Sequence, residues 1–109
     1  MSAVNLIDPI AAYFAAEPQG AEAIARCFTS DARVYDEGKA HIGLAAIRAW
    51  SSQSAARYRY TLEPRAVKLA GHMHQVQTHV IGDFPGSPID LTFSFRVQHG
   101  LIAELEIAV

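Results

Sequence analysis

Asp36 is the side chain of this sequence that is best placed to do chemistry. It closes the short alternating run 32–36, in which Val34 and Asp36 share one face of a predicted strand. We expect Val34 to point into the core, so the carboxyl group of Asp36 would lie in apolar surroundings, where it could move protons. The alternative is a plain turn residue, because Asp36-Glu37-Gly38 is ordinary turn composition. Glu37 falls on the opposite face and is expected in solvent.

Other reactive residue types fit simpler roles. His72 and His74 could present two imidazoles on one side of a strand, yet no third ligand is near them in the sequence, so we expect no metal site. Cys27 lies in an apolar stretch and is expected to be an inert, packed thiol. The sequence has no glycine-rich phosphate loop, and no cofactor is expected.

Three helices are predicted to position these residues. Their ranges are 5–16, 21–28 and 44–56. In the first helix Pro9 suits the first turn, and Ile10 and Phe14 recur at helical spacing. This helix stops at the Glu-Pro-Gln-Gly sequence 17–20. In the third helix the apolar spacing lays Trp50 onto the core.

The rest of the sequence predicts strands joined by short turns. The run 32–36 forms a hairpin, and four longer strands span 58–69, 73–84, 89–98 and 101–109. Connections this short make neighbouring strands antiparallel. In the third of the long strands, Phe93 and Phe95 share one face with Leu91, whereas Asp90 lies on the opposite face.

Helices followed by a long antiparallel meander indicate an α+β fold, in which helices cover one face of the sheet. A strongly twisted sheet curls into a cone around the first helix, and the two further helices cannot fill its mouth, so a cavity is expected. With 109 residues, the chain fits a single domain over 1–109. Half of its residues are hydrophobic and 18% are charged, which is a globular composition.

The composition also excludes several partners. A net charge of -2 gives no basic surface for nucleic acid. No apolar run approaches the roughly 20 residues that span a bilayer, so no membrane association is expected. The sequence does not begin with the charged start and apolar run of a signal peptide, which predicts a cytoplasmic location.

Several segments together resemble a known superfamily. They are Ala12-Tyr13-Phe14-Ala15-Ala16, the stretch FTSDARVYD from Phe28 to Asp36, Gly43-Leu44-Ala45-Ala46-Ile47-Arg48-Ala49-Trp50, and Gly100-Leu101-Ile102-Ala103-Glu104-Leu105. The chain resembles nuclear transport factor 2-like proteins, which include ketosteroid isomerases, SnoaL-type polyketide cyclases and scytalone dehydratase. The stretch 82–88 is most similar to a hairpin of uncharacterised SnoaL-like bacterial proteins. This resemblance implies the same cone-shaped, cystatin-like fold.

The resemblance also implies a site. Asp36 corresponds to the carboxylate with which ketosteroid isomerases shuttle a proton, and Tyr13 to the first-helix tyrosine that donates a hydrogen bond to the substrate oxygen. The triplet Pro88-Ile89-Asp90 matches the isomerase's protonated aspartate, but the strand periodicity points Asp90 away from the cone. The alternative for Tyr13 is a core aromatic whose hydroxyl reaches a backbone carbonyl.

Two functions therefore stay open for the predicted pocket. One is cofactor-free isomerisation, cyclisation or dehydration of a small apolar molecule, with Asp36 as general acid/base; the other is ligand binding or protein interaction without chemistry. By resemblance, the polar outer face that carries Gln75, Gln77 and His79 is expected to form a homodimer. Besides Asp36 and Tyr13, the side chains expected to line the pocket are Phe14, Val34, Trp50, Tyr58, Tyr60, Phe93, Phe95 and Leu105.

Overall fold

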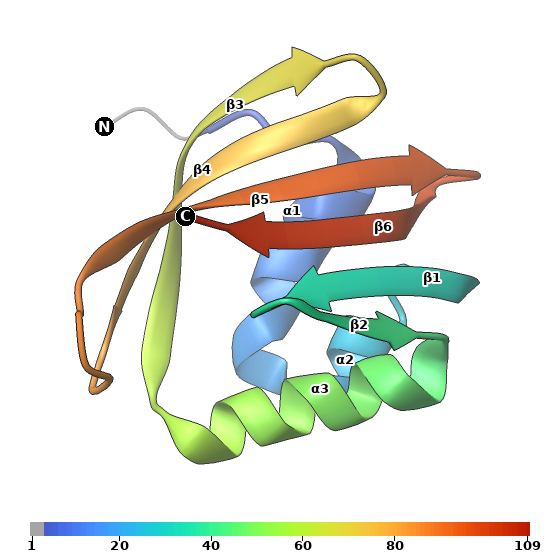
Figure 1. Cartoon of the computed structure of the whole chain (residues 1–109). Helices are drawn as coiled ribbons and strands as arrows, with labels where there is room; N and C mark the ends of the chain where they lie inside the picture. Colours follow the sequence, from blue (N-terminus) through green and yellow to red (C-terminus); the bar gives the residue numbers. More distant parts are fainter. Residues whose placement is uncertain (1–3) are drawn as a thin grey trace.

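The helices of this protein pack against one face of a strongly curved sheet (Figure 1). The structure is a computed structural model and describes residues 4–109. Within that range no helix is long and apolar enough to cross a membrane. The elements, in chain order, are α1 (Asp8–Ala16), a 3₁₀ turn η1 (Glu17–Gln19), α2 (Ala21–Ala25), β1 (Phe28–Asp36), β2 (Lys39–Ile42), α3 (Leu44–Arg57), β3 (Tyr60–Ala70), β4 (Met73–Gly82), β5 (Ile89–Gln98) and β6 (Leu101–Ala108).

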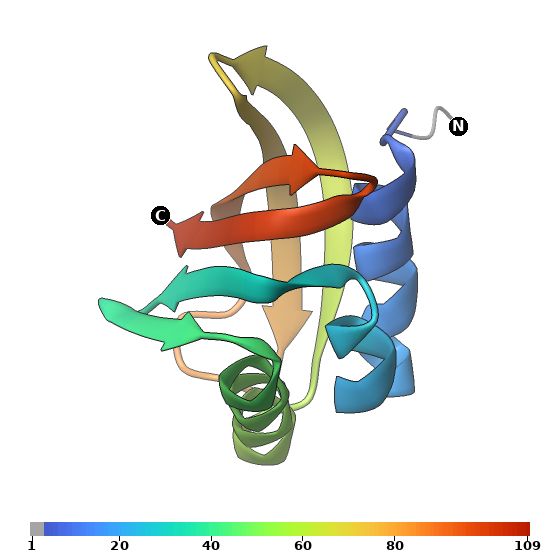
Figure 2. The same ribbon diagram turned by 90° about the vertical axis from the view of Figure 1, so that its right-hand side faces the viewer.

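The first helix is held to the sheet by a stripe of buried side chains. Pro9 lies in its first turn, where the missing N–H costs nothing. Ile10, Tyr13 and Ala16 recur every third residue and are all buried, so they form one face of the helix. The helix starts later than the predicted residue 5, and it continues into the 3₁₀ turn at Glu17. Figure 2 shows α1 standing beside the curved strands, with α3 below β1 and β2.

The α+β class and the curved sheet are confirmed, but the direction of one strand pair is not the predicted one. The strand order is β2-β1-β6-β5-β4-β3. All neighbours are antiparallel except β1 and β6, which run parallel, with Val34 beside Leu105. The meander from β3 to β6 therefore returns to the first strand, and the sheet is mixed. Short turns govern only strands that are consecutive in the chain, and β1 and β6 are not.

The start of β1 also differs from the prediction. Residues 29–31, which separate the predicted helix 21–28 from the predicted strand 32–36, lie inside β1, because this strand already begins at Phe28. Their side chains are largely exposed, which explains the polar sequence. The second helix is correspondingly shorter than predicted and ends at Ala25.

A tight two-residue turn places Asp36 at the end of β1. Asp36 pairs with Lys39, so the loop consists of Glu37 and Gly38 alone. Both loop residues have positive φ, 53° and 75°, as a type I′ hairpin turn requires. The predicted hairpin is confirmed, and it fixes Asp36 as the last residue of the strand.

An aromatic cluster forms the centre of the core. The ring of Tyr13 lies 5.3 to 6.4 Å, between centroids, from the rings of Phe14, Phe28, Phe93 and Phe95. Offset and edge-to-face rings at these distances attract each other beyond the area they bury. The cluster joins α1 to the middle of β5.

Replacement of Phe95 by Ala tests this core. Phe95 is completely buried, so the lost ring would leave a cavity and lower the free energy of unfolding by about 3–5 kcal/mol. Urea unfolding at equilibrium measures the change. Leu69→Ala is the control, because Leu69 is 67% exposed and its truncation should change stability by about 0.5 kcal/mol or less. Similar losses in both variants would contradict the proposed centre of the core.

Candidate functional site

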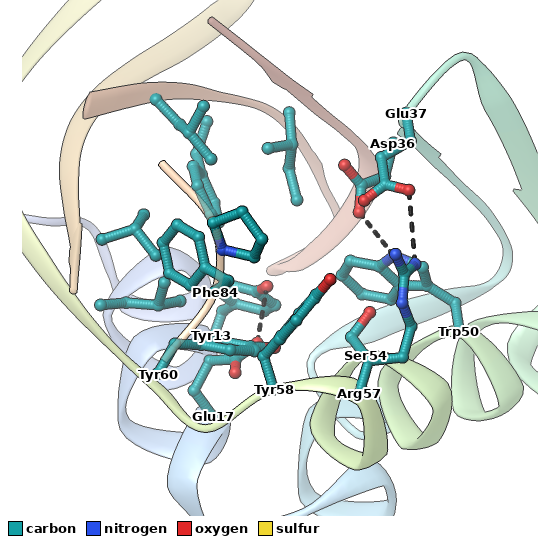
Figure 3. A pocket seen from close by; sticks show the side chains of 16 residues that line it. Tyr13, Glu17, Asp36, Glu37, Trp50, Ser54, Arg57, Tyr58, Tyr60 and Phe84 are labelled. Atoms are coloured by element: carbon teal, nitrogen blue, oxygen red, sulfur yellow. Dashed lines mark hydrogen bonds and ion pairs between the residues drawn. The ribbon is translucent and has the colours of Figure 1, made fainter. Parts of the chain in front are cut away.

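The sheet and helices enclose a pocket of about 370 Å³ that opens to solvent (Figure 3). One part of its wall is apolar and comes from β3, β4, β5, β6 and the loop after β4; these residues are Leu62, Val80, Phe84, Pro85, Leu91, Phe93 and Ile107. The other part is polar or aromatic and comes from α1, η1, the end of β1 and the turn after it, α3, the link from α3 to β3, and the start of β3. These residues are Tyr13, Glu17, Asp36, Glu37, Trp50, Ser54, Arg57, Tyr58 and Tyr60.

Asp36 lies on the pocket wall and is held there by Trp50. The indole N–H of Trp50 donates a hydrogen bond of 3.0 Å to Oδ2 of Asp36. Burial raises the pKa of Asp36 above its ordinary value, while the Trp50 hydrogen bond and, more weakly, His41 oppose that rise. None of the ion pairs between residues 4–109 includes Asp36. This carboxyl group is therefore a partly desolvated acid that the indole N–H holds in place, which suits it to proton transfer.

An ion pair lies at the mouth of the pocket. Nη1 of Arg57 is 3.5 Å from Oε2 of Glu37, and both side chains are exposed, as expected for Glu37. The guanidinium of Arg57 also lies 5.4 Å from the centre of the Tyr58 ring, in cation–π contact. The ring of Tyr58 in turn meets Phe84 edge to face at 6.0 Å. These contacts join the end of α3 to the loop after β4 across the opening.

Tyr13 and Glu17 form a second polar group on the wall. The hydroxyl of Tyr13 donates a hydrogen bond of 2.9 Å to Oε2 of Glu17. Burial raises the pKa of Tyr13 well above its ordinary value, and the nearby charge of Glu17 adds to the effect. Burial also raises the pKa of Glu17, and the hydrogen bond from Tyr13 partly offsets this rise. Tyr13 is thus a donor in the pocket, but its proton is directed at Glu17.

The pKa of Tyr60 is affected by the carboxyl groups of both Glu17 and Asp36. Burial raises its pKa far above the ordinary value, and the charges of Glu17 and Asp36 raise it further. Tyr60 therefore keeps its proton at every ordinary pH and can only donate or accept a hydrogen bond. The two acids lie close enough to this one phenol for their charges to act on it.

The structure brings together most, but not all, of the residues expected in the pocket. Besides Asp36 and Tyr13, the predicted residues that line it are Trp50, Tyr58, Tyr60 and Phe93. Four other residues do not line the pocket: Phe14, Val34, Phe95 and Leu105. Val34, Phe95 and Leu105 are completely buried in the core, and Phe14 packs against it, because α1 and its neighbours fill that end of the cone.

Asp90 lies outside the pocket, on the outer face of the sheet. Its Oδ1 is 2.7 Å from Nδ1 of His79, which stands opposite Asp90 in the neighbouring strand. The strand periodicity predicted this direction correctly. Asp90 therefore offers no second acid to the pocket.

Among the residues that line the pocket but were not predicted from the sequence are Glu17, Ser54, Arg57 and the loop residue Phe84. Glu17 was assigned to the stop of the first helix because Pro18 follows it. The signal that could have identified it is the spacing of four residues from Tyr13, which places both side chains on one helix face. Phe84 and Pro85 come from a loop whose path no periodicity predicts.

Comparisons with known proteins agree with this architecture. A family model, the SnoaL-like domain, matches residues 10–105. A crystal structure of a candidate polyketide cyclase from Sinorhizobium meliloti is 39% identical, with a TM-score of 0.89 over 94% of each chain. No curated protein sequence matches the chain.

Two more distant structures share the fold alone. A Catenulispora acidiphila protein with a ketosteroid isomerase-like fold, crystallised with trimethylamine, is 17% identical over 96% of this chain and 87% of its own, with a TM-score of 0.82. A cystatin-fold protein from Novosphingobium aromaticivorans is 19% identical over 93% and 95%, with a TM-score of 0.75.

Replacement of Trp50 by Phe tests the contact that holds Asp36. The ring remains, but the N–H donor is lost, so the pKa of Asp36 should rise above its value in the unaltered protein. A pH titration of the Asp36 carboxyl carbon by ¹³C NMR measures this shift. An unchanged or lower pKa would show that the indole N–H does not stabilise the ionised carboxylate.

Proposed function

The chain belongs to the SnoaL-like domain family, and we propose that its pocket binds a small, largely apolar carbonyl compound and moves a proton on it. The observation that supports this proposal best is Asp36, a partly buried carboxyl group on a wall that is otherwise rich in aromatic and aliphatic side chains. A cavity of about 370 Å³ suits a molecule of one to three rings.

The proposed chemistry follows from the carboxyl group of Asp36 on the pocket wall. Asp36 as carboxylate takes a proton from the carbon next to a carbonyl group, and the electrons of the C–H bond form a C=C bond as the carbonyl oxygen becomes an enolate. If the substrate is a β,γ-unsaturated ketone, Asp36 can return the proton at the γ-carbon of the dienolate, and the reaction is an isomerisation. If the enolate carbon attacks a second carbonyl of the same molecule, a ring closes and the new alkoxide oxygen takes the proton from Asp36. No cofactor is needed for either step.

The likeness to the Sinorhizobium meliloti protein favours ring closure among these outcomes. At 39% identity over nearly the full length of both chains, the relative is close enough to suggest a shared class of substrate. A polyketide chain carries alternating carbonyl groups, and the carbons between them have the acidic hydrogens that a carboxylate base can remove.

The alternative is a binding protein of the same fold. Oδ2 of Asp36 is already occupied by the Trp50 hydrogen bond, as in a carboxylate with a purely structural role. In that case the pocket would hold its ligand without changing it, or the domain would act through a protein partner.

A probe ketone distinguishes the two functions without knowledge of the natural substrate. β-Tetralone is apolar and enolisable, so catalysed enolisation appears as exchange of its α-hydrogens for deuterium, followed by proton NMR in D₂O. We expect the protein to accelerate the exchange and Asp36→Asn to reduce that acceleration about a hundredfold or more. Asp31→Asn is the matched control, since Asp31 is exposed, does not line the pocket, and its change should leave the rate unchanged.

Each outcome of this experiment is informative. Acceleration that disappears in Asp36→Asn but persists in Asp31→Asn supports the enzyme. Binding of β-tetralone to the unaltered protein without acceleration, seen as perturbed NMR signals of pocket residues, supports the binding protein. Equal acceleration by all three proteins would remove Asp36 from the chemistry.

We also propose a homodimer through the outer face of the sheet. This face is polar and carries Gln77 and Thr92, which hydrogen-bond across the strands, and the His79–Asp90 pair. The mass measured by light scattering should be twice that of the 11.9 kDa chain, and a monomer mass would contradict the proposal.

A further inference from the structure

The hydroxyl of Tyr13 is not available to a ligand in the way that the resemblance implies. Tyr13 is 1% exposed, and its proton is directed at Oε2 of Glu17, 2.9 Å away. A substrate oxygen at Tyr13 would have to displace this hydrogen bond and leave the Glu17 oxygen without its donor. Another group on the same wall is therefore better placed to meet the oxygen.

Glu17 is that group. It lines the pocket, and Tyr13 engages only its Oε2, which leaves Oε1 as a second oxygen that can carry a proton. The backbone at Glu17 is still helical, with φ −48° and ψ −51°, so the side chain is carried on the same face as Tyr13. No ion pair between residues 4–109 includes Glu17. Figure 3 shows it beside Tyr13 and Tyr60, apart from the labelled pair Asp36 and Trp50.

We propose that Glu17, positioned by Tyr13, is a second catalytic residue that protonates the carbonyl oxygen of the substrate while Asp36 acts on carbon. This inference rests on the proposed function. The proposed site then contains two carboxyl groups with different hydrogen-bond donors: the phenol of Tyr13 donates to Glu17, and the indole of Trp50 donates to Asp36.

The proton transfers balance without any further reactant. Asp36 as carboxylate removes the α-proton, the C–H electrons form C=C, and the carbonyl oxygen takes the proton of Glu17. The products are an enol, protonated Asp36 and ionised Glu17. In the second half Glu17 takes back the enol proton, the carbonyl reforms, and the C=C electrons take the proton of Asp36. The new C–H bond forms at the same carbon, or at the γ-carbon when the substrate is a β,γ-unsaturated ketone and the C=C bond moves into conjugation. Both acids return to their starting states.

The charges of the wall narrow the substrate class. Glu17 and Asp36 have no cationic partner among the ion pairs of the described chain, and the cation at the mouth, Arg57, is paired with Glu37. A ligand with a carboxylate of its own would meet the negative charge of Asp36 there. We therefore infer a neutral carbonyl compound as the substrate, and not an oxo acid.

The groups around Glu17 determine how its activity depends on pH. Burial favours its protonated form, and the hydrogen bond from Tyr13 favours the ionised form. The other titratable and charged groups of the pocket wall are Asp36 and Glu37 from the end of β1, Arg57 from α3, and Tyr58 and Tyr60 before and in β3. The rate should rise with pH as Asp36 ionises and fall as Glu17 ionises, with apparent pKa values that belong to the pair.

The pH profile of β-tetralone exchange tests this role. Gln at position 17 can still accept from Tyr13 but cannot transfer a proton, so Glu17→Gln should lower the rate about a hundredfold and remove the alkaline decline. Tyr13→Phe should move that decline to higher pH, because the bond that stabilises ionised Glu17 is lost. A merely structural Tyr13 would change the rate without moving the profile. Glu22→Gln is the matched control, since Glu22 is exposed and pairs with Arg48 outside the pocket.

A binding measurement separates this inference from the proposed function. β-Naphthol resembles the enol of β-tetralone, and calorimetry should show that it binds and that Glu17→Ala weakens binding about tenfold, whereas β-naphthoate should not bind. If exchange depends on Asp36 but Glu17→Gln changes neither the rate nor the profile, the inference is wrong and the proposed function stands. If no exchange occurs but β-naphthol binding still depends on Glu17, the enzyme is refuted and Glu17 is only a ligand contact. Binding of β-naphthoate as tight as that of β-naphthol would overturn the substrate class.

Discussion

Tyr13 lies at the boundary between the packed core and the pocket, with its ring in the core and its hydroxyl at the pocket wall. Its ring is enclosed by four phenylalanines and ties α1 to the centre of β5. Its hydroxyl emerges on the other side of the cluster, where it bonds to Glu17 at the pocket wall. A buried phenol needs a partner for its O–H, and here the partner is an acid at the end of the same helix. The position of the pocket's inner wall therefore follows from the packing of one ring.

The carboxyl groups of the pocket are in an unfavourable environment that the fold imposes on them. Burial raises the pKa of both Asp36 and Glu17, and the main opposing effect on each is a hydrogen bond, from Trp50 to Asp36 and from Tyr13 to Glu17. A guanidinium beside either group would stabilise the ionised form and make it a poorer base. The arrangement costs folding stability at neutral pH, where a desolvated carboxyl is harder to ionise than in the unfolded chain. Such a cost is common at sites that perform proton transfer.

Much of the fold and part of the site could be predicted from the sequence, since both depend on local patterns. Alternation along 32–36 and a turn sequence were enough to direct Asp36 inward, and the same argument directed Asp90 outward. Whether an inward-pointing side chain reaches the pocket or stays in the core could not be predicted. Phe93 and Phe95 share one face, yet only Phe93 reaches the pocket, because that depends on where the helices lie. Glu17 was missed because Pro18 suggested a stop where the chain continues as a 3₁₀ turn. The parallel pairing of β1 with β6 involves residues far apart in the chain and leaves no local signal.

That pairing has a consequence for how the chain is made. The carboxyl group of Asp36 is presented by β1, which has only the short hairpin partner β2 on one side and the last strand, β6, on the other. An isolated two-stranded hairpin is marginally stable in water. During synthesis on a ribosome the first half of the chain can form helices, but β1 cannot join the sheet until β6 has been translated. Contacts of such sequence separation slow folding. The strand that presents Asp36 thus joins the sheet only after β6 exists, although β1 is synthesised before it.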